Sequence, residues 1–140
     1  MLSAGAIVLS IWAGINLLVA TLVLFHVLVR RRHPLIAHVV FEERELSELD
    51  AKAVATIKAL AVLLNAAAVS VSLLVLFLVW MSLARGQSSA WWALLIAVGF
   101  GQIMQFVGDA LVGNKTVPAS VTTTILFILG MALAGFGLIG

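Results

Sequence analysis

The 140-residue chain contains no cysteine, and only 10% of its residues are charged. The absence of cysteine excludes disulfide bonds, thiolate metal sites and catalysis by a thiol. Soluble domains carry about 25% charged residues, so the scarcity of charge excludes an ordinary water-soluble domain. The chain must therefore be explained by its hydrophobic residues, which make up 64% of it.

Four long apolar runs occupy most of the chain. An α-helix rises about 1.5 Å per residue, so about 20 residues cross the roughly 30 Å hydrocarbon core of a bilayer. The runs predict four transmembrane helices at about residues 4–29, 54–84, 90–112 and 121–140, which form a single domain over residues 1–140. The first run is too long for a signal peptide, and no basic residue precedes it. We therefore predict an all-α, polytopic membrane protein whose first partner is the lipid bilayer.

Basic residues gather at one set of predicted helix ends. Most of them lie in the segment 30–53 and in the loop before the last run, whereas the remaining loop has only Arg85. Lysine and arginine accumulate in cytoplasmic loops, so we predict that the loop 30–53 is cytoplasmic and that both termini lie outside the cytoplasm. These loops also explain the net charge of +2, so no nucleic-acid partner is expected. The basic residues on the predicted cytoplasmic side are Arg30, Arg31, Arg32, Arg44, Lys52 and Lys115.

Small residues are arranged in strips along three of the four runs. In the second run, Lys58, Asn65 and Ser72 recur every seven positions, and alanines lie between them on the same helix face. Lipid provides no hydrophobic force between helices, so transmembrane helices associate where small residues allow their backbones to approach. The residues for which we predict a helix-packing role are Ala61, Ala68, Gly101, Gly108, Gly130, Ala134 and Gly137.

Several polar side chains are expected to lie at one level of the membrane. Gln102, Gln105 and Asp109 share one face of the third helix, and Asp109 lies about one turn from its cytoplasmic end. A charge in hydrocarbon costs about 2.5–3.5 kcal/mol, so Asp109 is predicted either to pair with Lys58 or to reach the headgroups. The predicted intramembrane polar cluster consists of His26, Lys58, Asn65, Gln102, Gln105 and Asp109.

The start of the second helix carries a capping signal. Ser47 and Asp50 have the spacing of a capping box, in which two side chains bond the free amides at a helix N-terminus. The second helix is therefore expected to begin near Glu48.

The two halves of the chain show an internal similarity. When residues 28–29 are aligned with residues 111–112, the only two prolines, Pro34 and Pro118, fall within one residue of each other. This alignment predicts a two-plus-two repeat, with each half forming a helix, a turn and a second helix. In length, span number and duplication the chain resembles a bacterial inner-membrane family of unknown function. The family's Glu-x-Gly-Asn-x-Ala-Ala turn corresponds here to Asp50-Ala-Lys-Ala53 and Ala119-Ser-Val-Thr122. The resemblance implies a bacterial inner-membrane location and no particular activity.

Two functions are compatible with these features. The first is an accessory or structural subunit of a membrane complex or homo-oligomer, held together by the small-residue strips. The second is a proton- or ion-coupled transporter or channel that uses Asp109, His26 and Lys58 within the membrane. A haem held between two histidines would need a second intramembrane partner for His26, so no cofactor, metal or enzymatic activity is predicted.

Overall fold

The computed structural model describes residues 1–29, 49–112 and 117–139 of the chain. This part forms the α-helices α1 (Leu2–Val29), α4 (Ala51–Met81), α5 (Ser88–Val112) and α6 (Val117–Ile139), with the short 3₁₀ helix η1 (Leu83–Arg85) after α4. Each of these four α-helices is long and apolar enough to cross a membrane. The prediction of an all-α fold with four transmembrane helices is therefore confirmed.

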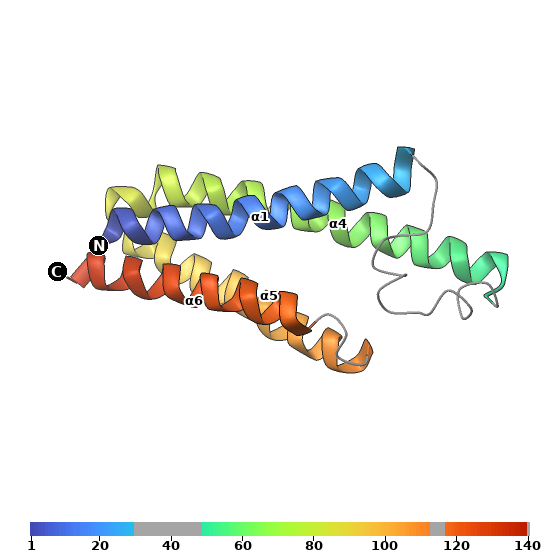
Figure 1. Ribbon diagram of the computed structural model, residues 1–140. Coiled ribbons are helices and arrows are strands. Elements are labelled where there is room, and N and C mark those ends of the chain that lie inside the picture. Colours follow the sequence, from blue (N-terminus) through green and yellow to red (C-terminus); the bar gives the residue numbers. More distant parts are fainter. Residues whose placement is uncertain (30–48, 113–116, 140) are drawn as a thin grey trace.

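The helices form two antiparallel hairpins, α1 with α4 and α5 with α6 (Figure 1). Helices α1 and α5 run away from the end of the bundle that holds both termini, and α4 and α6 return to it. This is the arrangement that a two-plus-two repeat requires, although the repeat itself stays a prediction. Helix α1 packs closely on α4 and on α6, α5 packs on α6, and α4 and α5 barely touch. The two hairpins are thus held together mainly through α1 and α6.

Helix α4 begins later than the capping box predicts. Asp50 is itself the N-cap, and its Oδ1 accepts a 2.6 Å hydrogen bond from the backbone N–H of Ala53. A short acidic side chain at the N-cap satisfies an amide of the first turn without help from an earlier residue. The predicted start near Glu48 is corrected to Ala51, and Ser47 lies outside the described residues.

A tight turn joins α4 to α5. The 3₁₀ helix η1 ends at Gly86, whose φ of 82° lies in the left-handed region and whose N–H donates to the carbonyl of Leu83. Glycine adopts this conformation without a steric penalty, so the chain can reverse within a few residues. The turn lies at the same end of the bundle as the two termini (Figure 1).

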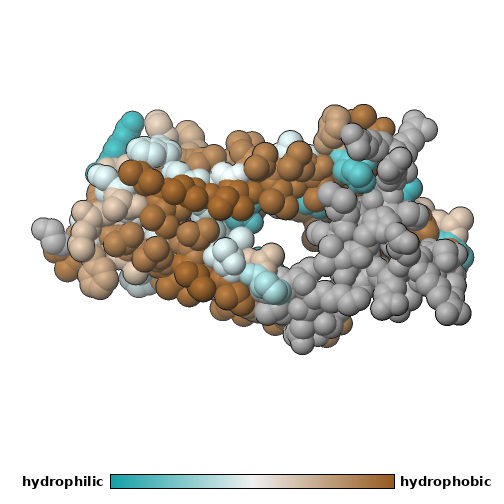
Figure 2. All heavy atoms as spheres, viewed as in Figure 1, coloured by the Kyte–Doolittle hydropathy of each residue, from teal (hydrophilic) through white to brown (hydrophobic). Residues whose placement is uncertain are grey.

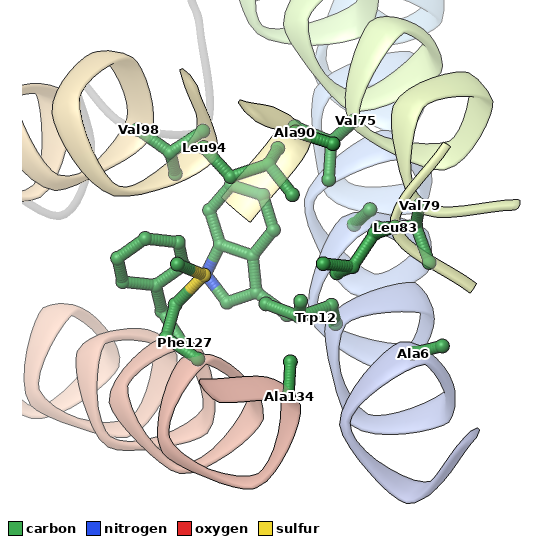
Figure 3. Packing of buried hydrophobic residues seen from close by; sticks show 13 residues of the cluster. Ala6, Trp12, Val75, Val79, Leu83, Ala90, Leu94, Val98, Phe127 and Ala134 are labelled. Carbon is green, nitrogen blue, oxygen red and sulfur yellow. The ribbon is translucent and has the colours of Figure 1, made fainter. Parts of the chain in front are cut away.

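The hydrophobic core occupies the half of the bundle nearest the termini. It draws on the first half of α1, the last turns of α4, η1, the first half of α5 and the second half of α6. The indole of Trp12 lies between α5 and α6 at the centre of this core (Figure 3), with its ring 5.7 Å from that of Phe127. The core residues are Ala6, Leu9, Trp12, Ala13, Val75, Val79, Leu83, Ala90, Leu94, Val98, Phe127, Met131 and Ala134.

Small residues bring α1 and α6 into close contact in this packed half. A Cβ on Gly5 would lie 2.7 Å from the Cα of Ala134, and a Cβ on Gly130 would lie 2.8 Å from the Cγ of Leu9. A Cβ on Gly137 would overlap the backbone of Leu2. The small-residue strip of α6 is therefore used for packing inside the chain.

Most of the helical surface faces outward and is apolar. Only 22% to 28% of each membrane-spanning window is buried inside the chain. Hydrophobic side chains cover much of the face seen in Figure 2. Such a surface is stable in lipid and not in water, so the chain is a multi-pass membrane protein.

Candidate functional site

A cleft separates the two hairpins beyond the hydrophobic core. It has a volume of about 420 Å³ and lies between the Leu64–Ser72 stretch of α4 and the Ala97–Gln105 stretch of α5, with Trp12 and Asn16 of α1 as further lining. The core closes this cleft on the side of the termini, because Trp12 belongs to both. We call it the α4–α5 cleft.

A second cleft lies on the other side of the same gap. Its volume is about 340 Å³, and it lies between the Ile15–Val19 stretch of α1 and the Ala119–Leu126 stretch of α6. Asn16 and Gln105 line both clefts, so the two spaces adjoin at these side chains. Figure 2 shows an opening on this face, bordered in part by pale and teal, less hydrophobic side chains. We call it the α1–α6 cleft.

A chain of hydrogen bonds connects α5 to α6 beside the two clefts. The hydroxyl of Thr124 donates to Gln102 Oε1 (3.0 Å), and Gln102 Nε2 donates to Gln105 Oε1 (3.3 Å). Gln105 Nε2 then donates to Ser120 Oγ (3.0 Å). The two glutamines lie three residues apart on α5, and Ser120 and Thr124 lie four apart on α6, so each pair shares a helix face. Gln102 and Gln105 of the predicted polar face therefore lie together, and their partners are on α6.

The asparagines of α1 and α4 behave differently. Asn16 Nδ2 donates to the carbonyl of Trp12, and Asn65 Nδ2 donates to the carbonyl of Ala61, each at 2.8 Å. Both amides thus bond to their own helix, four residues back, instead of crossing to a neighbour. The structure does not bring Asn65 into the hydrogen-bonded chain of α5 and α6, although its side chain is buried.

The polar stripe predicted on the second helix faces the inside of the bundle. Ser72 is only 1% exposed and lines the α4–α5 cleft together with Ala68. Ala61 and Lys58 continue the stripe and are half-buried. The stripe therefore distinguishes the inward face of α4 from its lipid face.

The titratable part of the predicted cluster is only partly described. His26 lies in the last turn of α1 and is half-buried. The side chain of Asp109 lies outside the described part of the chain, so the predicted Lys58–Asp109 pair stays a prediction. Among the residues that the structure describes, no group of three histidine, aspartate or glutamate side chains could hold a metal ion.

The glycines of α5 have surroundings unlike those of α6. A Cβ on Gly101 or on Gly108 would meet no atom within 4 Å in the described structure, and the same holds for Gly14 of α1. Gly101 lines the α4–α5 cleft. Within the described chain its lack of a side chain widens the cleft, and its predicted role in helix packing stays a prediction.

The indole N–H of Trp12 is a buried donor without a hydrogen-bond partner among the described residues. The corresponding group of Trp91 donates to the carbonyl of Met131 at 2.9 Å. A buried polar group that finds no partner costs about 1–3 kcal/mol, so this N–H offsets part of the stability that the packing of Trp12 contributes.

Sequence reasoning did not assign Trp12, Asn16, Ser120 or Thr124 to the site. One signal for the last two was present, because Ser120 and Thr124 are four residues apart and can face a glutamine pair with a spacing of three. No comparable signal marks Trp12, because tryptophan occurs both at the membrane–water interface and in packed cores.

Comparison of the chain with protein families, with curated proteins and with solved structures finds no match. The candidate site therefore depends on its own geometry, and the resemblance to a bacterial inner-membrane family stays a prediction.

Proposed function

We propose that the chain is a small membrane transport protein whose solute pathway begins in the α4–α5 cleft. The observation that carries this proposal is the position of amide and hydroxyl groups around a cleft between the membrane-spanning helices. Asn16 and Gln102, for example, lie near the middle of α1 and α5. Polar groups at this depth are costly in lipid and typically line water-filled cavities or substrate pathways.

The shape of the cleft supports an open state with access from one side. The core closes the space toward the termini, while the hairpins diverge toward the opposite end (Figure 1). Helix α1 ends at Val29 at that opposite end, and the basic residues that follow it in the sequence favour a cytoplasmic location for the open end. The proposed state is therefore open to the cytoplasm, and passage of a solute requires the core around Trp12 to separate.

The accessory-subunit function is the second candidate, and one observation favours it. Helices α4 and α5 barely touch, and small residues such as Ala68 and Gly101 line the gap between them. A transmembrane helix of another chain could pack against such walls. The small residues of α6 do not add to this argument, because they already pack on α1.

Thiol labelling of single-cysteine variants distinguishes the transport function from the accessory function. The chain contains no cysteine, so each variant has one thiol only. N-ethylmaleimide reacts with thiolates, which form in water and not in hydrocarbon. In membranes, Gly101→Cys should be labelled if water fills the cleft. Ile103→Cys is the matched control, because Ile103 lies two residues away on α5, is 63% exposed and does not line either cleft. It should stay unlabelled because it faces lipid.

The outcomes lead to different conclusions. Labelling of Gly101→Cys but not Ile103→Cys supports a hydrated pathway. If neither variant is labelled, water does not fill the cleft and the transport proposal is wrong. If, in addition, the native complex in mild detergent contains other chains and Gly101→Cys becomes reactive only after they dissociate, the accessory function is correct.

The orientation of the chain in the membrane can be tested with another single-cysteine variant. Gln87 is exposed in the turn between η1 and α5, at the end of the bundle that holds both termini. A membrane-impermeant maleimide added to intact cells should label Gln87→Cys. Protection in intact cells together with labelling after lysis would reverse the proposed orientation, and the cleft would then open to the outside.

A further inference from the structure

The polar groups that line the two clefts are all uncharged among the described residues. They are amides and hydroxyls from all four helices: Asn16, Ser72, Gln102, Gln105, Thr122 and Thr123. An ion that leaves water for a site of low polarity loses solvation worth several kcal/mol or more. Proteins that pass ions compensate with opposite charges or with rings of carbonyl oxygens. The described lining provides neither, so its chemistry favours a neutral solute.

The hydrogen bonds within the lining leave polar atoms of Gln105 and Asn16 available to a further partner. Gln105 uses one N–H for Ser120, and its other N–H has no partner in the described structure. Asn16 uses one N–H for the carbonyl of Trp12, and its Oδ1 accepts no hydrogen bond from the described residues. These two side chains line both clefts, one from α5 and one from α1. A molecule between them can accept from one helix and donate to the other.

We infer that the cleft binds a small, uncharged solute that carries both a hydrogen-bond acceptor and a donor, as amides, ureas and polyols do. This inference rests on the proposed function and adds the substrate class. The cleft volume of about 420 Å³ is in the range of small-molecule sites. Apolar residues complete the described walls, so the solute exchanges its water partners for a few amide contacts without meeting a charge among the described residues.

Trp12 provides an optical probe for this site, because it lines the α4–α5 cleft. A variant with Trp80→Phe, Trp91→Phe and Trp92→Phe keeps Trp12 as the only tryptophan. Its fluorescence in liposomes is measured with three quenchers, namely acrylamide (a neutral amide), iodide (an anion) and caesium (a cation). Acrylamide should quench Trp12 severalfold more than either ion does.

A pair of glycine variants tests whether acrylamide arrives through the cleft. Gly101→Leu places a side chain in the cleft, whereas Gly14→Leu places one outside it, and neither Cβ meets an atom within 4 Å. Acrylamide quenching should fall severalfold with Gly101→Leu and stay unchanged with Gly14→Leu. Equal quenching in both variants would show that acrylamide reaches Trp12 by another path, and the inference would be overturned.

A second measurement leaves the tryptophans in place. Iodoacetamide (neutral) and iodoacetate (anionic) both alkylate thiols, and their rate ratio is compared between Gly101→Cys and the exposed Gln87→Cys. The ratio should favour iodoacetamide severalfold more at Gly101→Cys than at Gln87→Cys. An equal ratio at the two positions overturns the inference even if N-ethylmaleimide labels Gly101→Cys, and the transport proposal then stands alone. Failure of every reagent at Gly101→Cys overturns both.

Discussion

The two halves of the bundle are built from the same four helices and differ in what holds these helices together. Near the termini, α1 and α6 approach at Gly5, Gly130 and Gly137, and every helix contributes to the core. In the other half, a Cβ on Gly101 would meet no described atom within 4 Å, and a cleft separates the hairpins. Lipid supplies no hydrophobic force between helices, so they stay together only where backbones approach or side chains form hydrogen bonds. The hairpins diverge where the glycine contacts end.

The largest expected effect comes from Gly5→Ala in the packed half. The new Cβ would overlap the backbone of Ala134, so α1 and α6 must separate, at a cost of about 1–3 kcal/mol or more. Gly14→Ala, on the same helix, has free space and should be neutral or slightly stabilising, because alanine favours a helix. Thermal unfolding in detergent measures both. Equal melting temperatures for the two variants would contradict the described α1–α6 contact.

A smaller effect is expected from the hydrogen bonds of the open half. Gln102→Leu and Thr124→Val each remove the bond between α5 and α6, and membrane hydrogen bonds contribute about 0.6 kcal/mol on average and up to about 1.7. The double variant should lose less than the sum of the two single losses. Thr122→Val is the control, because this hydroxyl donates to Pro118 within its own helix. Additive losses for Gln102 and Thr124 would show that the two side chains do not interact.

Two tryptophans provide a comparison across the packed half. Trp91→Phe removes a hydrogen bond to the carbonyl of Met131 and should cost about 1 kcal/mol. Trp12→Phe removes an N–H donor that has no partner in the described structure. The cost of burying that donor disappears, and this gain offsets part of the packing energy that the smaller ring loses. The unfolding free energy should therefore fall less for Trp12→Phe. A larger fall for Trp12→Phe would show that the packing lost in the core outweighs the removal of the unpartnered N–H.

The smallest effect is expected at the start of α4. Asp50→Ala removes the N-cap hydrogen bond to Ala53, and an exposed cap of this kind contributes about 0.5–1 kcal/mol. The change should increase hydrogen exchange in the first turn of α4 and leave the global melting temperature nearly unchanged. A large global shift would mean that this end of the chain takes part in the main packing.

The sequence was sufficient to predict the membrane-spanning helices but not to predict which helices pack against each other. Long apolar runs identify membrane spans directly, because the thickness of the bilayer sets the length of a helix. The spacing of Gln102 and Gln105 likewise placed both on one face, as the structure shows. The same spacing could not reveal that Ser120 and Thr124 would be their partners, because which helices become neighbours depends on packing over the whole bundle.

Gly101 and Gly130 illustrate this limit most clearly. Both were predicted to pack helices, on the same argument about small residues. The structure places Gly130 against Leu9 and leaves Gly101 beside open space in a cleft. A glycine in a transmembrane helix permits close approach but does not determine whether a neighbour is there. Which glycines pack became visible only when the partner helix was known.

The divergence of the hairpins also affects the surrounding bilayer. Helices that lie close together at one end and apart at the other occupy unequal lateral areas in the two leaflets (Figure 1). Lipids adjust to such a shape by changing local thickness or packing, each at a modest energetic cost. Membrane curvature or lateral tension that relieves the mismatch therefore acts on the angle between the hairpins. Because that angle sets the width of the cleft, the lipid composition should change how far the cleft opens.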